Sequence, residues 1–347
     1  MNNTVNTAVN PLALGVDLGG TKIELVLADR EGRVVAQQVV RTEAERGMEA
    51  VLANLYEGIR LLLSQVVPPA GPPAKDDLAT LLQVLQEQGH EVIGLGLGVA
   101  AVLSSAQGVV HEAPNLGWRE VPLRKMVEER TGLPVWLEND TNVAALGEYR
   151  FGAGQRTSPM VYLGLGTGIG AGIIIDGQLY RGIGGGAGEV GHIVIEPEGP
   201  PCGSGHPGCW EALASGTAIG RMAREAIERG RGDTLLSLAG GDPVRVTGRI
   251  VAEALRQGDG TAREIIQKAG AYLGMGLASV INFMNPALIV IGGGVAARLL
   301  DPLLEAARPE IERRAFPALW KQVRIVPAGL KETSAALGAA SLPHFGY

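Results

Sequence analysis

The sequence predicts an α/β protein built from two related domains with a cleft between them. Glycine contributes 51 of 347 residues, well above the usual ~7%, and its copies cluster in DLGGTK, GLGTGIGAG, GIGGGAGEVG and IGGGV. Apolar runs typical of strands alternate with runs of helical period. A hairpin with a glycine-rich tip also occurs once in each half, as LGVDLGGTKIELVLADREGRV and as MVYLGLGTGIGAGIIIDGQLYRG.

The first half opens as a β-meander. Residues 12–20 and 22–29 are strand-like runs joined by a glycine turn, and RVVAQQVV continues them. Two helices follow, GMEAVLANLYEGIRLLLSQVV and LATLLQVLQEQG, separated by the breaker at residues 68–77, which we interpret as a surface insertion. The strand EVIGLGLGVA, the helix VPLRKMVEERTG and the strand LPVWLEND complete this half.

The second half becomes helical after its hairpin. Helical patterns cover GTAIGRMAREAIERG, RIVAEALRQGD and TAREIIQKAGAYLGMGLASVINFM. PALIVIGGGV and QVRIVPAGL are strands, and TSAALGAASL is a last helix. We expect a first domain over residues 12–138, completed by a C-terminal helix at about 333–347, and a larger second domain over residues 139–332.

Composition excludes several classes of protein. A net charge of −6 and a pI of about 5.5 disfavour nucleic acid and anionic membranes as partners. No run has the ~18 uncharged apolar residues of a membrane span, and MNNTVNTAVNP lacks the features of a signal peptide. Two cysteines make no disulfide framework, so we expect a reducing, cytoplasmic location.

The glycine tips are candidate phosphate sites. In GVDLGGTK, the consecutive N–H groups of Gly19, Gly20 and Thr21 can form an anion-binding concavity, and Asp17 can hold a hydrated Mg²⁺. The segment is neither a Walker A loop nor a dinucleotide fingerprint. One copy alone is as typical of an ordinary hairpin, but GLGTGIGAG, with Thr167 at its tip, is a second. Two tips facing across a cleft suit a polyphosphate.

Two further segments carry candidate site residues. IGGGV opens a helix after a buried strand, where backbone can lie flat against a base or ribose. Asn139 and Asp140 end a strand, where Asp140 or Thr141 can cap the next helix and Asp140 can act as general base for a hydroxyl. Glu189, His192 and Glu211 add groups that pair with vicinal hydroxyls, as a sugar site requires.

These motifs together resemble the ROK family (repressors, open reading frames and sugar kinases) of the actin-like, ribonuclease H-like ATPase superfamily. The resemblance runs from about Leu12 to Ser341 and rests on GVDLGGTK, GLGTGIGAG, VIGGGV and GEVGHIVIEPEGPPCGSGHPGCWEALASG. It implies ATP-dependent phosphorylation of the 6-hydroxyl of a hexose, with glucose first. An N-acetylhexosamine (N-acetylglucosamine or N-acetylmannosamine) or fructose is the alternative substrate.

The resemblance also implies roles for individual residues. Asp140 is the implied catalytic base, and Asp17 the carboxylate that orients Mg²⁺. The residues implied to hold the sugar are Asn115, Asn139, Asp140, Glu189, His192 and Glu211. Those assigned to ATP are Asp17, Gly19, Gly20, Thr21, Lys22, Gly166, Thr167, Gly168, Gly292, Gly293 and Gly294; Lys22 is included because it lies within the first motif.

Two departures from the family pattern stand out. Ala100-Ala101 replaces the usual Pro-Gly of the strand-end loop, which leaves the exact sugar open. Ser204 replaces the middle cysteine of the family's zinc motif, so His192, Cys202 and Cys209 supply three ligands and His206 is the candidate fourth. A structural Zn²⁺ site and a zinc-free loop held by Gly and Pro turns both remain open.

Other functions fit the sequence less well. A family repressor carries a DNA-binding module before the first phosphate loop, and only 14 residues precede GVDLGGTK here. A sugar-sensing or hydrolytic relative is disfavoured by the intact Asp140. Polyphosphate remains open as the phosphoryl donor, although IGGGV favours a nucleotide. The resemblance further suggests a homodimer or homotetramer with a sugar and ATP as its small-molecule partners.

Overall fold

The computed structural model describes residues 10–67 and 78–347, so the breaker at 68–77 lies outside the described residues. The chain divides into two compact units. The first unit holds the described residues up to Gln155 together with Leu179–Ala187 and Thr333–Tyr347, and the second holds Arg156–Gln178 and Gly188–Glu332. This division places the first crossing of the chain after Gln155, beyond the expected boundary at residue 138.

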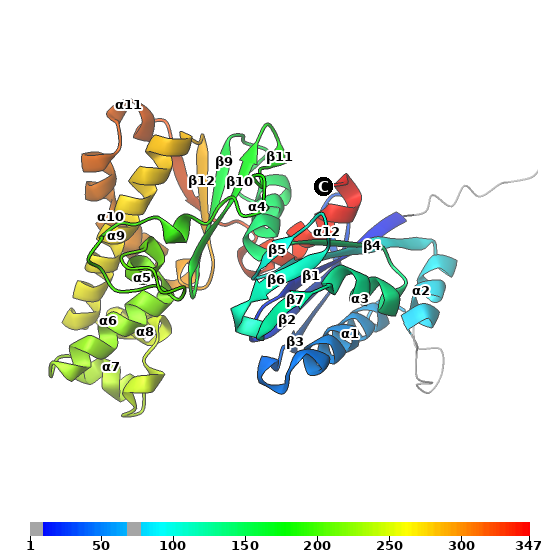
Figure 1. Ribbon diagram of the computed structural model, residues 1–347, viewed down its shortest axis with the longest axis horizontal. Helices are drawn as coiled ribbons and strands as arrows, with labels where there is room; N and C mark the ends of the chain where they lie inside the picture. The colour runs from blue at the N-terminus through cyan, green and yellow to red at the C-terminus, as the bar shows by residue number, and fades with distance from the viewer. Residues whose placement is uncertain (1–9, 68–77) are drawn as a thin grey trace, which may run out of the picture. The chain divides into compact units, whose positions relative to one another are not determined.

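The first unit is built on a five-stranded sheet in the order β3-β2-β1-β4-β8 (Figure 1). β1 pairs antiparallel with β2 and parallel with β4, and β8 runs parallel to β4. The strands are β1 (Asn10–Leu18), β2 (Lys22–Asp29), β3 (Val34–Arg41), β4 (His90–Val99) and β8 (Val135–Asn139). All match the predicted runs, because each combines apolar residues with a turn signal at its end.

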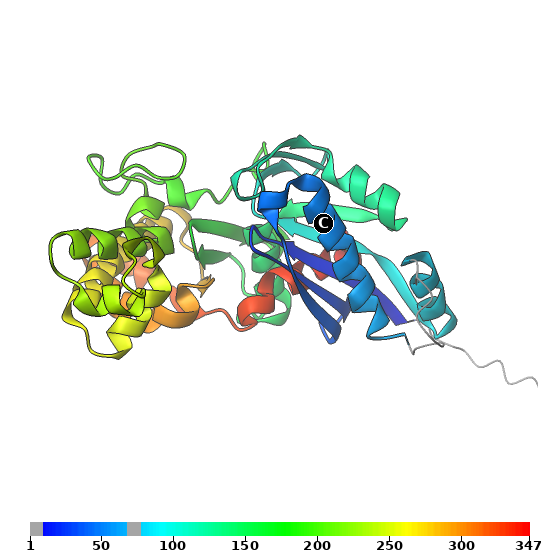
Figure 2. The same cartoon turned by 90° about the horizontal axis from the view of Figure 1, so that it is seen from below.

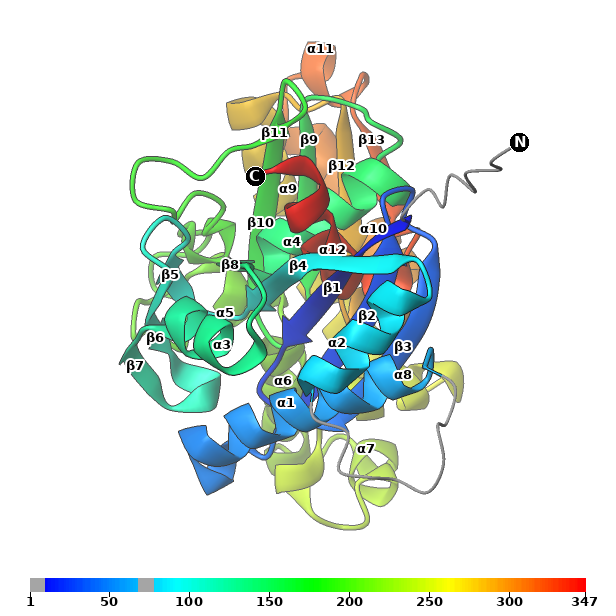
Figure 3. The same ribbon diagram turned by 90° about the vertical axis from the view of Figure 1, so that its right-hand side faces the viewer.

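Helices cover both faces of this sheet (Figure 3). Helices α1 and α2 pack on one face, and α4 and α12 on the other. Their bounds, with that of α3, are α1 (Met48–Ser64), α2 (Leu78–Glu87), α3 (Leu123–Thr131), α4 (Asp140–Phe151) and α12 (Ser334–Phe345).

Glycines let α12 lie directly on the sheet. Gly15 of β1 and Gly96 of β4 are register partners, and a Cβ added at either would overlap the backbone of α12. A Cβ at Gly147 of α4 would likewise overlap α12. The C-terminal helix therefore belongs to the first unit because these positions carry no side chain.

A small antiparallel sheet, β5-β6-β7, lies beside α3 at the top of Figure 2. Its strands are β5 (Val102–Ser104), β6 (Val109–Ala113) and β7 (Trp118–Val121). These strands were not predicted from the sequence, because they are short and keep several charged side chains in solvent. The turn η2 (Pro114–Leu116) between β6 and β7 carries Asn115.

The second unit repeats the strand plan of the first. Its sheet has the order β11-β10-β9-β12-β13, with β9 antiparallel to β10 and parallel to β12, which is parallel to β13. The strands are β9 (Met160–Leu165), β10 (Ile169–Ile175), β11 (Gln178–Leu179), β12 (Leu288–Gly292) and β13 (Arg324–Pro327). The predicted α/β fold with a duplicated hairpin is thus confirmed.

Helices dominate the rest of the second unit. The long α9 lies against α10 (Figure 1), and Gly270 and Gly274 of α9 bring the two backbones close. The helices are α5 (Trp210–Ala214), α6 (Gly216–Glu228), α7 (Asp233–Leu238), α8 (Gly248–Arg256), α9 (Gly260–Met284), α10 (Ala296–Arg314) and α11 (Pro317–Trp320). Within the described parts of the chain, no helix combines the length and apolarity needed to span a membrane.

Candidate functional site

The first glycine tip is pinned by Thr42, a fully buried residue. The Thr42 hydroxyl donates to the Gly19 carbonyl oxygen at 2.6 Å, and its N–H donates to the Thr21 carbonyl oxygen at 3.0 Å. The N–H of Gly19 closes the turn on the Lys22 carbonyl oxygen at 3.1 Å. Of the three amides predicted to bind an anion, Gly19 is therefore used by the turn, which leaves those of Gly20 and Thr21 as candidates.

Asn115 lies beside this tip. A Cβ added at Gly20 would come within 2.9 Å of the Asn115 Cβ, so the second glycine of the tip is required by this approach. The sequence alone could not show that Gly20 and Asn115 lie close together, because nearly a hundred residues separate them.

Asp140 is the first residue of α4, directly after the tip of β8. The helix cap is Asn139, whose Oδ1 accepts from the N–H groups of Thr141 at 2.9 Å and Asn142 at 3.2 Å. The expectation that Asp140 or Thr141 caps the helix is therefore wrong. Asn139 caps the helix, and the Asp140 Oδ1 accepts from the Thr141 hydroxyl at 3.4 Å. The Asn139 Nδ2 also donates to the Ala101 carbonyl oxygen at 3.3 Å.

Asp17 faces two further carboxylates. It pairs in register with Glu24 of β2 and with Gly98 of β4, and a Cβ at Gly98 would sit 3.6 Å from the Asp140 Cα. Burial raises the pKa of Asp17 to about 7, the charges of Asp140 and Glu24 act in the same direction, and Lys22 opposes them. The two Glu24 oxygens accept from the Lys22 Nζ at 2.9 Å and the Gln37 Nε2 at 3.1 Å, so Asp17 and Asp140 are the candidates to face a divalent cation such as Mg²⁺.

The second glycine tip is held by Glu211. The Glu211 Oε2 accepts from the N–H of Ile169 at 3.1 Å, and a Cβ added at Gly168 would overlap that oxygen. The N–H of Gly166 closes the turn on the Gly168 carbonyl oxygen at 3.0 Å. Glu211 was predicted to hold sugar hydroxyls; here one of its oxygens fixes the hairpin.

A pocket of about 530 Å³ lies in the second unit next to this tip. It joins Gly166 and Thr167 to Gly294, three residues predicted to contact ATP. Sequence reasoning missed the rest of the lining, which comprises Gly216, Thr217, Gly220, Arg224, Val246, Thr247, Gly248, Arg249, Val295, Arg298 and Leu299.

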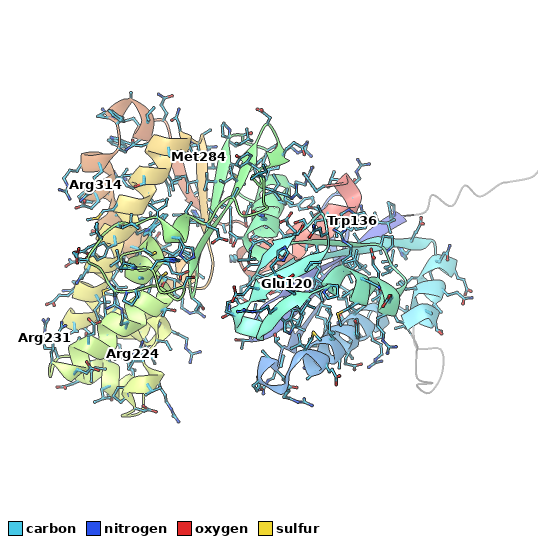
Figure 4. The ribbon with its side chains drawn as sticks, in the orientation of Figure 1. Glu120, Trp136, Arg224, Arg231, Met284 and Arg314 are labelled. Carbon is cyan, nitrogen blue, oxygen red and sulfur yellow. The ribbon has the colours of Figure 1, made fainter. Side chains whose placement is uncertain are left out.

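The pocket suits an anionic ligand. The first residues of α6 and α8 line it, so both helices direct their N-termini, where the dipole is positive, toward it. Arg224 (Figure 4) donates to the Val246 carbonyl oxygen at 2.8 Å, and Arg298 donates to the Gly294 carbonyl oxygen at 2.9 Å. A Ser or Thr followed by Gly at the start of a helix, as in SGTAIG and VTGRI, is the sequence signal that could have found this wall.

The glycines of the IGGGV run have two different roles. A Cβ at Gly292 would overlap the Tyr162 side chain, and Gly293 has a φ of +97° and lies against the Leu165 backbone. These two glycines thus serve packing and turning. Only Gly294 of the three lines the pocket.

The cysteine loop gathers three candidate metal ligands. One ligand atom each from His192, Cys202 and His206 lies within 4.8 Å of the others, and the His192 Nδ1 is 3.7 Å from the Cys202 Sγ. A tetrahedral zinc site places its ligand atoms about 3.6 Å apart, from bond lengths of about 2.0–2.3 Å. The cluster is therefore close to the size that zinc requires.

The two thiols differ in character. Burial raises the pKa of Cys202, but hydrogen bonds from the Ser204 and His206 N–H groups, and with Cys209 and His192, outweigh it and lower that pKa to about 7. Burial and the neighbouring Cys202 raise the pKa of Cys209, whose Sγ lies 3.6 Å from the His206 carbonyl oxygen. Cys202 has the easily formed thiolate that a metal binds.

Glu189 and His192 stand side by side. The His192 Nε2 is 3.9 Å from a Glu189 carboxylate oxygen, while its Nδ1 faces Cys202. The Glu189 side chain is 54% exposed. The imidazole thus has one nitrogen toward the cysteine loop and one toward an exposed acid.

The sequence is similar to those of known proteins over most of its length. The ROK family model matches residues 72–345. The chain is similar to a glucokinase of Streptomyces coelicolor, 35% identical over 95% of this chain and 97% of that protein, and to a putative xylose repressor of Caldicellulosiruptor sp., 33% identical over 95% of this chain and 77% of the repressor.

A solved structure extends the likeness to three dimensions. The crystal structure of a ROK family glucokinase from Streptomyces griseus in complex with glucose and AMPPNP has a TM-score of 0.77 and 35% identity, over 95% of this chain and 98% of that one. This likeness confirms the expected actin-like ATPase fold. The chain belongs to the ROK family.

Proposed function

We propose that the chain is an ATP-dependent hexose kinase that phosphorylates the 6-hydroxyl of glucose. The observation that carries the proposal is the 530 Å³ pocket, which joins the second glycine tip to Gly294 and to two helix N-termini. It suits a nucleotide better than inorganic polyphosphate, because Val246, Val295 and Leu299 line it with apolar surface that a nucleoside can contact. Similarity to a glucokinase solved with glucose and AMPPNP supports both substrates.

In the proposed reaction, Asp140 accepts the proton of the sugar 6-hydroxyl as that oxygen attacks the γ-phosphorus and ADP leaves. The Asn139 cap fixes the first turn of α4, so the backbone that carries Asp140 needs no reorganisation. Asp17 is the candidate to orient Mg²⁺, which when bound neutralises phosphate charge. The amides of Gly20, Thr21, Thr167 and Gly168 are the candidate phosphate donors.

The proposed sugar ligands are Asn115, Asn139, Asp140, Glu189, His192 and Glu211. Asn139 and Glu211 already make structural hydrogen bonds, so each can offer the sugar only its remaining capacity. His192 is placed to donate from Nε2 if its Nδ1 binds a metal, because metal binding at one nitrogen leaves the proton on the other.

We propose that the cysteine loop holds a structural zinc ion with His192, Cys202, His206 and Cys209 as its ligands. The size of the His192–Cys202–His206 cluster and the low pKa of Cys202 support it. Ser204 is no substitute for a thiolate, since a hydroxyl is far less acidic. The metal would brace the loop and orient His192.

We also propose a cytoplasmic homodimer or homotetramer. Two free cysteines fit a reducing compartment. Phe283, 85% exposed, lines an apolar pocket of about 350 Å³ together with Met284, the residue labelled at the end of α9 in Figure 4. Exposed aromatic surface of this kind is typical of association faces, and light scattering of the purified protein tests it.

A panel of sugars tests the kinase proposal. ADP release is measured with glucose, mannose, fructose, N-acetylglucosamine and N-acetylmannosamine. We expect the highest kcat/KM with glucose. A preference for an N-acetylhexosamine would make that sugar the proposed substrate. Ala100-Ala101, which departs from the family pattern, would then be the first candidate for the cause of the preference. Sugar binding without turnover would favour a sugar-sensing regulator, because the chain is also similar to a putative xylose repressor.

A further inference from the structure

Glu138 is a fully buried carboxylate one residue before Asn139 and Asp140. It is 1% exposed, and both of its oxygens are engaged. Oε1 accepts from the Asn139 N–H at 2.9 Å and from the Asn142 Nδ2 at 3.0 Å. Oε2 accepts from the Arg181 Nε at 2.6 Å. From the sequence alone, this residue was only part of a predicted strand.

Arg181 comes from the segment Leu179–Ala187, which belongs to the first unit although the chain on either side of it belongs to the second. The Ala187 N–H donates to the Arg181 carbonyl oxygen at 3.0 Å, so the segment closes on itself as a loop. A Cβ at Gly185 would lie 3.2 Å from the Leu103 carbonyl oxygen. The loop thus meets the rest of the first unit at two places, through the Arg181–Glu138 ion pair and where Gly185 approaches β5.

The loop connects two groups of site residues along the chain. Glu189 follows Ala187 by two residues, so its backbone can lie no more than about 8 Å from that of Ala187. At its other end, the Arg181 guanidinium reaches the residue that hydrogen-bonds the backbone of Asn139 and the side chain of Asn142. One ion pair therefore fixes both the strand tip and the lead-in to Glu189.

We propose that Glu138 and Arg181 are positioning residues for phosphoryl transfer. Arg181 holds the loop 179–187 on the strand tip, and Glu138 fixes the backbone from which Asp140 projects. This inference rests on the proposed function, since it takes Asp140 as the base. Neither side chain need touch the sugar: removal of the guanidinium leaves a buried charge beside Asp140 and releases the loop.

The test is a double-mutant cycle with Arg181→Gln, Glu138→Gln and the two combined. We expect Arg181→Gln to raise the sugar KM at least tenfold and to lower kcat, with the ATP KM unchanged within threefold. The double variant should recover part of the loss, because it removes the unpaired charge. Arg181→Lys should lie between wild type and Arg181→Gln.

Arg33→Gln is the matched control. Arg33 pairs with Asp29 at 2.9 Å, and Asp29 is also buried, but the pair lies at the β2–β3 turn. This control should leave the kinetics unchanged. Equal increases of the sugar and ATP KM values in Arg181→Gln, or kinetics like those of the control, would overturn the positioning role.

Amide hydrogen exchange tests positioning without relying on turnover. Arg181→Gln should speed exchange in peptides that cover residues 139–145 and 179–187, and Arg33→Gln should not. Unchanged exchange in either peptide overturns the inference, whatever the sugar activity. Absence of sugar-stimulated ADP release in the wild-type protein instead overturns the proposed function.

Discussion

Replacement of Asp140 by Asn separates catalysis from the stability of helix α4. Loss of a general base lowers turnover by about 10²–10⁴, which corresponds to about 2.7–5.5 kcal/mol of transition-state stabilisation. Stability should change by less than about 1 kcal/mol. The cap is the Oδ1 of Asn139, so Asp140→Asn loses only a carboxylate near the helix N-terminus, worth about 0.3–1 kcal/mol. Relief of its repulsion with Asp17 offsets part of that.

Asn139→Ala is the matched comparison. It removes the acceptor of the Thr141 and Asn142 N–H groups and should cost about 0.5–2 kcal/mol of stability. The assays are coupled ADP release, denaturant unfolding and calorimetric titration with glucose. Asp140→Asn should bind glucose nearly as the wild type does. Turnover within tenfold of wild type, or a larger stability loss than in Asn139→Ala, would refute the assignment of base and cap.

Three further predictions concern charge, nucleotide and metal. The pKa of Asp17 is about 7 in the folded chain, against its ordinary value of 3.8. Between these values the folded state keeps a proton that the unfolded chain loses. Stability without Mg²⁺ should therefore fall as the pH rises from about 4 to 7. Denaturant midpoints across that range should slope in wild type and flatten in Asp17→Asn; equal slopes would refute this. Arg224→Ala should raise the ATP KM about tenfold, through the loss of a charge-assisted contact, and leave the sugar KM constant. The control is Arg229→Ala, which changes an exposed residue at the end of the same helix. Equal effects of the two changes would count against the pocket as the ATP site. Metal analysis should find about one zinc per chain, and a value below roughly a tenth of an equivalent would exclude a tight structural site.

The hairpins and buried strands could be predicted because their signals are local. Apolar runs bounded by Gly turns gave β1, β2, β9 and β10 close to their observed bounds. The repeat of the hairpin indicated the duplicated plan that both sheets share. The strands β5, β6 and β7 were missed because each has only 3 to 5 residues, too short for a clear apolar run.

The parts that could not be predicted depend on residues far apart in the sequence. Gly15 and Gly96 are needed because α12 lies on both, a contact that no local pattern reveals. The pocket wall is intermediate: the Ser-Gly and Thr-Gly starts of α6 and α8 mark part of it, but no local pattern shows that Arg224 and Arg298, from separate helices, line the same pocket. Whether Asn139 or Asp140 caps α4 depends on which residue begins the helix. Sequence patterns locate a helix start only to within a turn, so they could not decide between the two.

Identification of the product is the direct test of the proposed sugar kinase activity. Purified protein is incubated with glucose, ATP and Mg²⁺, and the products are identified by ³¹P and ¹³C nuclear magnetic resonance. We expect one glucose 6-phosphate for each ADP, with formation of both abolished or strongly slowed in Asp140→Asn. ADP formed at the same rate without sugar, or a phosphate ester at another hydroxyl, would contradict it.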